Sequence, residues 1–452
     1  MNIKIIALFT VVPIVFLSGC NLPQNQNVSA DNSPAQPTKI GTTEESRTTV
    51  PEAPIAAENT PAKPPGGELP PEPDLPAPPL VEYVIPQNLI NPLQAGDPFT
   101  ITYIQMIGIT IGWAIAESGN DGDHILHTMD GGITWRDITP AEASPAGSSS
   151  GKSAVTHFLD AETAWVAYYN LGGASIPEQP VVWRTTDGGK SWTPSVVFQG
   201  MEAASFFAPI ALWFDASGVG WFLVEVDAGM SKSYAYLFQS LDGGYQWDIL
   251  VSPTHQPEGS DGIQACGKSE LVFADLLNGW LLRDCSGLFP FSFIDKTVDG
   301  GTRWRMIELP AVPDEFAADN GFCTPFDLTV FTVDSLKLGL HCQDFTADEP
   351  ANFYYLISTD DGGEQWDIYD LPSRDATFLN EELGWSIGRE IYQSMDGGRT
   401  WNFVKKVIWD GQFSIADANN WWAVARDGVN IELVHTMDGG ASWEIISPAI
   451  GN

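Results

Sequence analysis

The sequence predicts an all-β protein: a seven-bladed β-propeller of four-stranded antiparallel blades, preceded by a signal peptide and a disordered proline-rich linker. The first observation is the motif Ser/Thr-x-Asp-Gly-Gly-x-x-Trp, which occurs seven times between TMDGGITW (128–135) and TMDGGASW (436–443). The second is a companion segment upstream of the motif, such as VFADLLNGW (272–280), in which an apolar strand and a short turn precede Gly-Trp or a related pair. Units of four short strands that recur every 35 to 62 residues are typical of propeller blades.

Residues 1–20 have the pattern of a lipoprotein signal peptide. Lys4 precedes an apolar run over 5–17, and Leu-Ser-Gly-Cys ends at Cys20. A basic start, an apolar stretch and small residues at the cleavage site mark a secretory signal, and the stretch is shorter than a membrane span. The final four residues resemble the lipobox of bacterial lipoproteins, a family in which the cysteine is lipidated and becomes the mature N-terminus. We expect Cys20 to be the lipid anchor; the alternative is an ordinary signal peptide with an incidental cysteine.

Residues 21–85 are expected to form a disordered tether. Residues 21–80 hold 14 of the chain's 33 prolines and no aromatic residue. Such a stretch cannot bury enough apolar surface to offset the entropy lost on ordering, and its proline-rich part favours extended polyproline II. The propeller is then expected over 86–452, held away from the membrane by the tether.

Within each motif, the residue types suit a tight turn between two strands. Consecutive glycines can take the positive φ angles that a tight hairpin requires. The aspartate can accept backbone N–H groups inside the turn, and the tryptophan supplies a large apolar surface between neighbouring sheets. We therefore predict structural rather than catalytic roles for the motif aspartates and tryptophans, which are Asp130, Asp187, Asp242, Asp299, Asp361, Asp396, Asp438, Trp135, Trp192, Trp247, Trp304, Trp366, Trp401 and Trp443.

The connections between the four strands of a blade, A to D, are expected to lie on two faces. The A–B turns and the Asp-Gly-Gly turns keep a nearly constant length and share one face, whereas the extra residues of blades two to five fall in the B–C loops and D–A crossovers of the other. Inserted loops gathered on one side of a rigid scaffold are typical of a recognition surface, although tolerated drift in loop length is the alternative. In these loops we select Tyr168, Tyr169, Phe289 and Phe291 as candidate binding residues, because exposed aromatic side chains are costly to leave in water.

The charge balance excludes some classes of partner. The chain has 58 acidic and 21 basic residues, for a net charge of −37. This balance argues against nucleic acid and against anionic lipid headgroups, so the only expected membrane contact is the N-terminal lipid. An acidic, well-solvated surface of an exported protein explains the same balance without any partner.

Four cysteines besides Cys20 are expected to form two disulfides. Cys266 and Cys285 have the same spacing as Cys323 and Cys342, and each pair brackets the same part of one repeat. An even number of cysteines in an exported chain indicates disulfides. We predict the pairs 266–285 and 323–342; a metal site is the weaker alternative, because no Cys-x-x-Cys occurs.

The sequence contains no recognisable catalytic or cofactor motif. His124 and His127 lack a helix and further ligands to make a metal site, and the acidic stretch 117–124 lacks the regular alternation of an EF-hand. No HExxH, GxSxG, P-loop or dinucleotide fingerprint occurs. We therefore predict no catalytic residue, no metal and no cofactor. A glycosidase needs only two suitably placed carboxylates, however, so the sequence leaves that class open.

The seven motifs resemble the Asp-box (BNR) repeat, which occurs in sialidases, in sortilin-type receptors, in some xyloglucan hydrolases and in the photosystem II assembly/stability factor family. The repeated Gly-Trp strand followed by the Asp box is most similar to the last of these. The resemblance covers about residues 100–450 and implies a propeller that acts as a binding or assembly scaffold without catalysis. The chain departs from that family in its few arginines, its acidic charge and its long tether, and it lacks the Arg-Ile-Pro of sialidases.

Together, these observations predict a monomeric, non-catalytic scaffold for a protein or polysaccharide partner at the cell envelope. The chain would be anchored through lipidated Cys20 outside the cytoplasmic membrane or on the outer membrane. The alternative is a glycoside hydrolase, sialidase-like or of another Asp-box type.

Overall fold

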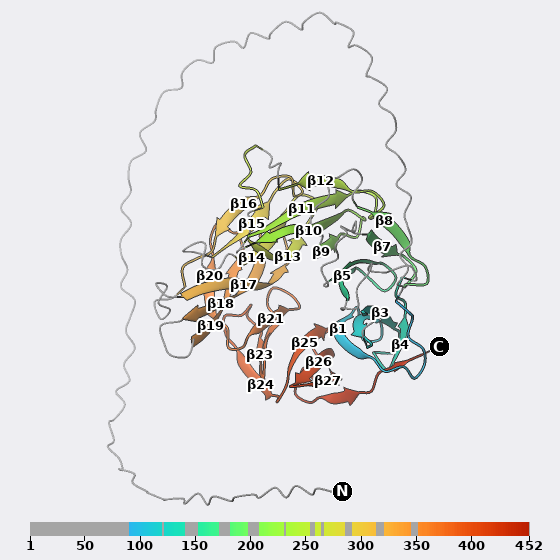
Figure 1. Ribbon diagram of the computed structural model, residues 1–452. Coiled ribbons are helices and arrows are strands. Elements are labelled where there is room, and N and C mark those ends of the chain that lie inside the picture. The colour runs from blue at the N-terminus through green and yellow to red at the C-terminus, as the bar shows by residue number, and fades with distance from the viewer. Residues whose placement is uncertain are drawn as a thin grey trace, which may run out of the picture. The chain divides into compact units, whose positions relative to one another are not determined.

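The computed structural model describes residues 90–119, 122–140, 152–170, 181–197, 208–229, 232–253, 258–263, 266–284, 292–312, 321–344 and 351–451. In this part of the chain every regular element is a β-strand, and no helix is long and apolar enough to cross a membrane. The strands form seven sheets arranged in a ring (Figure 1). The predicted seven-bladed propeller is confirmed.

Each blade is one antiparallel sheet in which strands A to D follow one another in chain order. The A strands are β1 (Thr100–Met106), β5 (Lys152–Phe158), β9 (Ala208–Phe214), β13 (Gly267–Phe273), β17 (Gly321–Val330), β21 (Asp375–Phe378) and β25 (Asp410–Ile415). The B strands are β2 (Gly112–Glu117), β6 (Ala164–Asn170), β10 (Gly220–Gly229), β14 (Gly279–Asp284), β18 (Leu336–Asp344), β22 (Gly384–Ile387) and β26 (Trp421–Asp427). The A strands of neighbouring blades contact one another at most junctions, so strand A is the innermost strand.

The outer half of each blade contains strands C and D. The C strands are β3 (Asp123–Thr128), β7 (Val181–Thr185), β11 (Lys232–Ser240), β15 (Phe293–Thr297), β19 (Ala351–Thr359), β23 (Glu390–Ser394) and β27 (Asn430–Thr436). The D strands are β4 (Thr134–Asp137), β8 (Thr193–Val196), β12 (Asp248–Val251), β16 (Arg305–Glu308), β20 (Asp367–Asp370), β24 (Asn402–Lys406) and β28 (Glu444–Ile446). A last short strand, β29 (Ala449–Ile450), returns to blade one.

The strand bounds place the length variation of the chain on one face of the ring. All seven A–B turns have the same length, from 107–111 in blade one to 416–420 in blade seven, and they share a face with the Asp boxes; we call it the turn face. The B–C and D–A connections lie on the opposite face, which we call the loop face. Their lengths vary from the short connection 388–389 to the long connection 252–266. In blade three the extra residues of the B–C connection lengthen the strands, because β10 and β11 continue as a paired hairpin to Gly229 and Lys232.

The Gly-Trp pair of strand B forms the joint between blades. In blade three a Cβ on Gly220 would lie 2.2 Å from the ring of Phe214, so only glycine leaves room for this aromatic at the end of strand A. Trp165 of blade two stacks on the other side of the same ring, with centroids 3.8 Å apart and planes at 4°. Trp221 stacks in the same way on Phe273 of blade four, at 3.7 Å. Each of these two joints therefore buries an aromatic ring between a glycine and a tryptophan.

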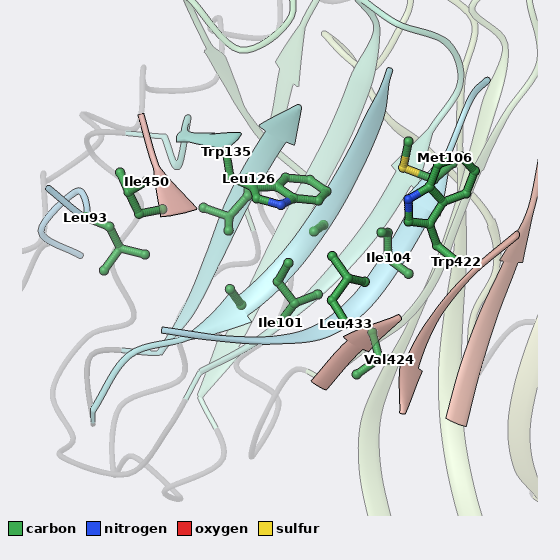
Figure 2. Close-up of a cluster of buried hydrophobic side chains, with 12 residues drawn as sticks. Leu93, Ile101, Ile104, Met106, Leu126, Trp135, Trp422, Val424, Leu433 and Ile450 are labelled. Atoms are coloured by element: carbon green, nitrogen blue, oxygen red, sulfur yellow. The ribbon is translucent and has the colours of Figure 1, made fainter. Parts of the chain in front are cut away.

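Blade one and blade seven close the ring through a shared apolar cluster and a strand pair. Trp422, Val424 and Leu433 of blade seven pack with strand residues of blade one that include Met106 and Trp135 (Figure 2). β29 pairs in parallel with β4, which adds a fifth strand to the sheet of blade one. Blade one therefore contains residues from both ends of the propeller.

The cysteines of blade five form a disulfide between paired strands. Cys323 in β17 and Cys342 in β18 lie directly opposite each other and are bonded, as their spacing predicts. Cys266 is also disulfide-bonded, and its expected partner, Cys285, lies outside the described residues. The Cys323–Cys342 bridge crosses the strand pair toward its loop-face end.

The segment before β1 is docked on the propeller. Ile90 is only 2% exposed and packs with Trp113 of blade one and Trp183 of blade two. The N–H of Leu93 donates to the carboxylate of Asp137 at 2.8 Å. The chain therefore enters the ring at the junction between the first two blades.

Candidate functional site

In all seven Asp boxes the aspartate closes the turn onto its own backbone. One oxygen of the aspartate accepts the N–H of the residue four positions later, as Asp130 does from Thr134 at 2.8 Å. The hydroxyl that begins the box accepts the N–H of the second glycine, as Thr128 does from Gly132 at 3.0 Å. Both bonds recur in the other six boxes.

The boxes also connect neighbouring parts of the ring. The first glycine of every box donates its N–H to a carbonyl in the A–B turn of its own blade. Its carbonyl accepts a side-chain donor from the preceding blade at five junctions, namely from Arg136 to Gly188, Trp165 to Gly243, Trp221 to Gly300, Lys296 to Gly362 and Trp422 to Gly131. The box tryptophans pack in the apolar clusters between their own blade and the preceding one.

These hydrogen bonds keep the box carboxylates of Asp187 and Asp438 ionised. The hydroxyl and N–H of Ser191 lower the pKa of Asp187 to about 2, and those of Ser442 do the same for Asp438. A carboxylate with such a low pKa is a poor proton donor near neutral pH. The box aspartates therefore hold the turn rather than supply a catalytic acid.

Acidic side chains on the innermost strands bind the backbone of the next blade. Glu270 in β13 accepts the N–H groups of Asp327 at 3.2 Å and of Leu328 at 2.9 Å in blade five. Asp327 in turn accepts the N–H of Ala376 in blade six at 3.0 Å. Strand β17 has a bulge at Asp327, whose φ is 49°, and the bulge presents two consecutive N–H groups to Glu270. Because strand A is the inner edge of its sheet, these carboxylates satisfy backbone groups that the sheet leaves unpaired.

Burial makes these inner carboxyl groups harder to ionise. It raises the pKa of Asp327 to about 7, with the negative charges of Asp375 and Glu270 adding to the rise and the Ala376 N–H opposing it. Burial also raises the pKa of Glu270 and of Asp375. Three carboxyl groups on consecutive A strands thus gather in blades four to six, and sequence reasoning missed them because no motif marks their positions.

A buried histidine–aspartate pair lies at the loop-face end of blade one. Nδ1 of His124 lies 2.8 Å from Asp137, and both side chains are almost fully buried. Burial opposes ionisation of Asp137, but hydrogen bonds from His124, from the Leu93 N–H and from Thr139 together lower its pKa. Among the described residues, Nε2 of His124 has no hydrogen-bond partner. The sequence indicated neither the pair nor its role in holding the segment before β1.

Tyr168 belongs to the interior of this region rather than to a binding surface. It packs with Ile90 and Ile138 and is 9% exposed, which corrects the expectation that it is presented to a partner. Burial raises its pKa well above the usual value, and the charges of Asp123 and Asp137 add to the rise. β6 is buried on both faces, and Tyr168 lies on the same face as Ala164 and Val166, which pack in the same cluster.

A second buried charged group lies in blade four. Arg283 in β14 forms a buried ion pair with Asp295 in β15. Burial raises the pKa of Asp295 to about 7, and the Arg283 guanidinium opposes this rise. Burial likewise lowers the pKa of nearby Lys268 to about 8. Removing one partner of such a buried pair would leave an uncompensated charge and destabilise the fold. The pair therefore has a structural role.

Several expected site residues lie outside the described part of the chain. They are Cys20, Cys285, Phe289 and Phe291, and the side chain of Tyr169 is likewise not described. Within the described ranges, no group of three or more His, Cys, Asp or Glu side chains could hold a metal ion.

The turn face carries exposed apolar side chains that the sequence reasoning did not single out. The second position of the Asp box is apolar and exposed in five blades, as Met129, Leu241, Val298, Met395 and Met437. Their exposed fractions run from 62% to 71%. The apolar residues at the second box position are visible in the repeated motif. This position varies between boxes, so the motif itself does not mark it as functional.

No protein-family model matches the chain, and comparison with curated proteins gives no match. Among solved structures, the chain is similar to YCF48 bound to D1 peptide, at 16% identity and a TM-score of 0.46, over 78% of this chain and 99% of that one. It is also similar to the Penicillium chrysogenum α-L-arabinanase complexed with arabinobiose, at 11% identity and a TM-score of 0.43, over 63% and 92%. A Mycobacterium tuberculosis puromycin-hydrolysing peptidase gives 10% identity and a TM-score of 0.50, over 78% and 54%. At these identities the likeness concerns the fold and not the activity.

Proposed function

We propose that the protein is a non-catalytic binding scaffold, exported and anchored through lipidated Cys20, that holds its propeller on a flexible tether at the cell envelope. The observation that carries the proposal is the use of the inner carboxylates. Glu270 accepts two backbone N–H groups of the next blade and Asp327 accepts one, so these two inner acidic groups of blades four and five serve to join blades. Groups engaged in this way are not available to activate a substrate without breaking the joint.

The partner is a protein or a polysaccharide, bound through the loop face. Support comes from the uneven lengths of the connections: the A–B turns are uniform, whereas the B–C and D–A connections differ several-fold between blades. A rigid ring that varies in length on one face only is the usual arrangement for recognition. Phe289 and Phe291, between β14 and β15, are the candidate contacts.

Capture on the immobilised full chain tests this function. The chain would be exposed separately to solubilised envelope proteins and to cell-wall and host polysaccharides. The variant Phe289→Ser/Phe291→Ser should lose the captured partner. The matched control is Leu276→Ser/Leu277→Ser, which removes two exposed apolar side chains from the turn face of the same blade and should retain it. If the Phe289→Ser/Phe291→Ser variant still captured the partner, the assignment of the binding surface to these loop-face residues would be wrong.

A glycoside hydrolase remains the second candidate because of one observation. The pKa of Asp327 is raised to about 7, and a carboxyl group that stays protonated near neutrality is what a glycosidase uses as its general acid. Shortening of glycans by the parent chain but not by Asp327→Asn would establish this class. Unchanged glycans with both proteins would leave the scaffold as the function.

A further inference from the structure

Most of the exposed apolar surface of the described chain lies on the turn face. Eighteen large hydrophobic side chains are exposed among the described residues, and twelve of them belong to the A–B turns or the Asp boxes of the turn face. They are Ile107, Ile109, Met129, Ile133, Leu241, Tyr245, Leu276, Leu277, Val298, Leu379, Met395 and Met437. The box hydrogen bonds do not require these residues, because Thr186 and Asp360 fill the second position in the other two boxes.

The three methionines among these positions lie in one sector of the ring. Blades six, seven and one are consecutive through the ring closure, and their boxes carry Met395, Met437 and Met129 at the same position. These three side chains are 71%, 62% and 71% exposed. Ile109, 57% exposed, lies in the A–B turn of blade one, and the box of that blade is hydrogen-bonded to the same turn through Gly131. Methionine is flexible and polarizable, and surfaces that accept a partner's apolar groups use it often.

The same face is strongly acidic. The seven A–B turns contain eight acidic residues and no basic residue, and the seven Asp boxes contain nine acidic and three basic residues. In this sector the hydrogen bond from the Thr400 hydroxyl lowers the pKa of Asp396, and that from the Ser442 hydroxyl lowers the pKa of Asp438 to about 2, so both box carboxylates remain ionised. Apolar side chains set among negative charges fit a partner that carries apolar groups among positive charges.

We propose that the turn face of blades six, seven and one is a second interaction surface, whose partner is a basic amphipathic protein segment with lysine or arginine between apolar side chains. The charge excludes the simplest alternatives. A second copy of this chain would bring two acidic faces together, and an anionic lipid surface would be repelled. This surface goes beyond the proposed function, which concerns the loop face.

The test is binding of synthetic peptides to the full chain. The probe is an amphipathic peptide of alternating lysine and leucine, compared with lysine–serine and glutamate–leucine peptides of equal length. The variant is Met129→Ser/Met395→Ser/Met437→Ser. The matched control is Ile408→Ser/Val429→Ser, which removes side chains that are 75% and 96% exposed in loop-face connections. All five positions are exposed, so an unchanged thermal melt is expected for both variants.

The parent should bind the lysine–leucine peptide more tightly than either comparison peptide, with affinity that falls as salt rises. The triple methionine variant should lose at least about tenfold in affinity for it, since buried apolar area is removed, and the control should lose none. Equal binding by the methionine variant, or an equal loss in the control, would overturn the proposal.

Two further results would also reject it. The first is sedimentation of the parent as a dimer that the methionine variant abolishes, because the occupant would then be a second copy. The second is methionine-dependent binding to phosphatidylcholine vesicles with no preference for the lysine–leucine peptide. Failure of the peptide-binding test on the turn face would leave capture through Phe289 and Phe291 on the loop face unaffected. The two proposals are therefore tested independently.

Discussion

Trp165 of blade two stacks on Phe214 of blade three, with ring centroids 3.8 Å apart and an angle of 4° between the planes. The same tryptophan donates its indole N–H to the carbonyl of Gly243 in the Asp box of blade three. One side chain thus supplies both the apolar and the polar contact of the joint. The two sequence repeats, Gly-Trp and the Asp box, meet at this contact and act as one unit.

Replacing Gly220 by alanine should destabilise the propeller. The added Cβ would lie 2.2 Å from the Phe214 ring, and the ring cannot move away because Trp165 covers its other side. We expect a loss of about 1–3 kcal/mol in the free energy of unfolding, measured by chemical denaturation. Gly108→Ala is the control, because no atom lies within 4 Å of the position of its Cβ. Equal stability of the two variants would contradict the joint.

Replacing the box aspartate Asp438 by alanine should cost stability without affecting partner capture. The substitution removes the acceptor for the N–H and hydroxyl of Ser442 and for the hydroxyl of Thr436. The midpoint temperature of thermal unfolding should fall. Capture of the partner by the loop face should persist when it is measured below that temperature. Loss of capture with unchanged unfolding would instead assign this carboxylate to a binding site.

The stability contributed by Asp327 should fall as pH rises. Its folded pKa, about 7, lies above the unfolded value near 3.8, so the folded state holds the proton more tightly. The contribution is complete below about pH 4 and is lost as pH rises through 7. In Asp327→Asn the amide can still accept the Ala376 N–H, so the variant should gain on the order of 2 kcal/mol relative to the parent between these limits. Urea unfolding at several pH values measures the difference; Asp427→Asn, at an exposed site on β26, should run parallel to the parent.

Removing the Cys323–Cys342 disulfide should destabilise blade five. The bridge closes a segment with a sequence separation of 19, for which chain-entropy arguments give about 3 kcal/mol. The double substitution Cys323→Ser/Cys342→Ser should lower the unfolding midpoint of the oxidised protein, and reduction should lower the midpoint of the variant further because Cys266 is also disulfide-bonded. If the oxidised variant and the oxidised parent unfold alike, the Cys323–Cys342 bridge adds nothing to stability.

The repeated motifs made the architecture predictable, because Asp130 and its six counterparts each mark the turn between strands C and D of one blade. The inner carboxylates were not predictable. Glu270 accepts hydrogen bonds from the next blade only because a bulge at Asp327 in β17 turns two N–H groups toward it. Neither Glu270 nor Asp327 lies in a repeated motif. Tyr168 adjoins a variable loop, where the sequence predicts exposure, but on β6 its side chain packs inward with Ile90 and Ile138. The exposed Met129 was overlooked because the box leaves its position free.

The pairing of β29 with β4 has a consequence for the order of events during synthesis. Ala449 and Ile450 leave the ribosome more than 300 residues after β4, whose outer edge they complete. Until then the outer edge of β4 is unpaired, and Trp135 lacks the cover that blade seven and Ile450 give it. Such edges are the parts of an unfinished β protein that pair with other chains. Protection of the growing chain must therefore last until the ring has closed.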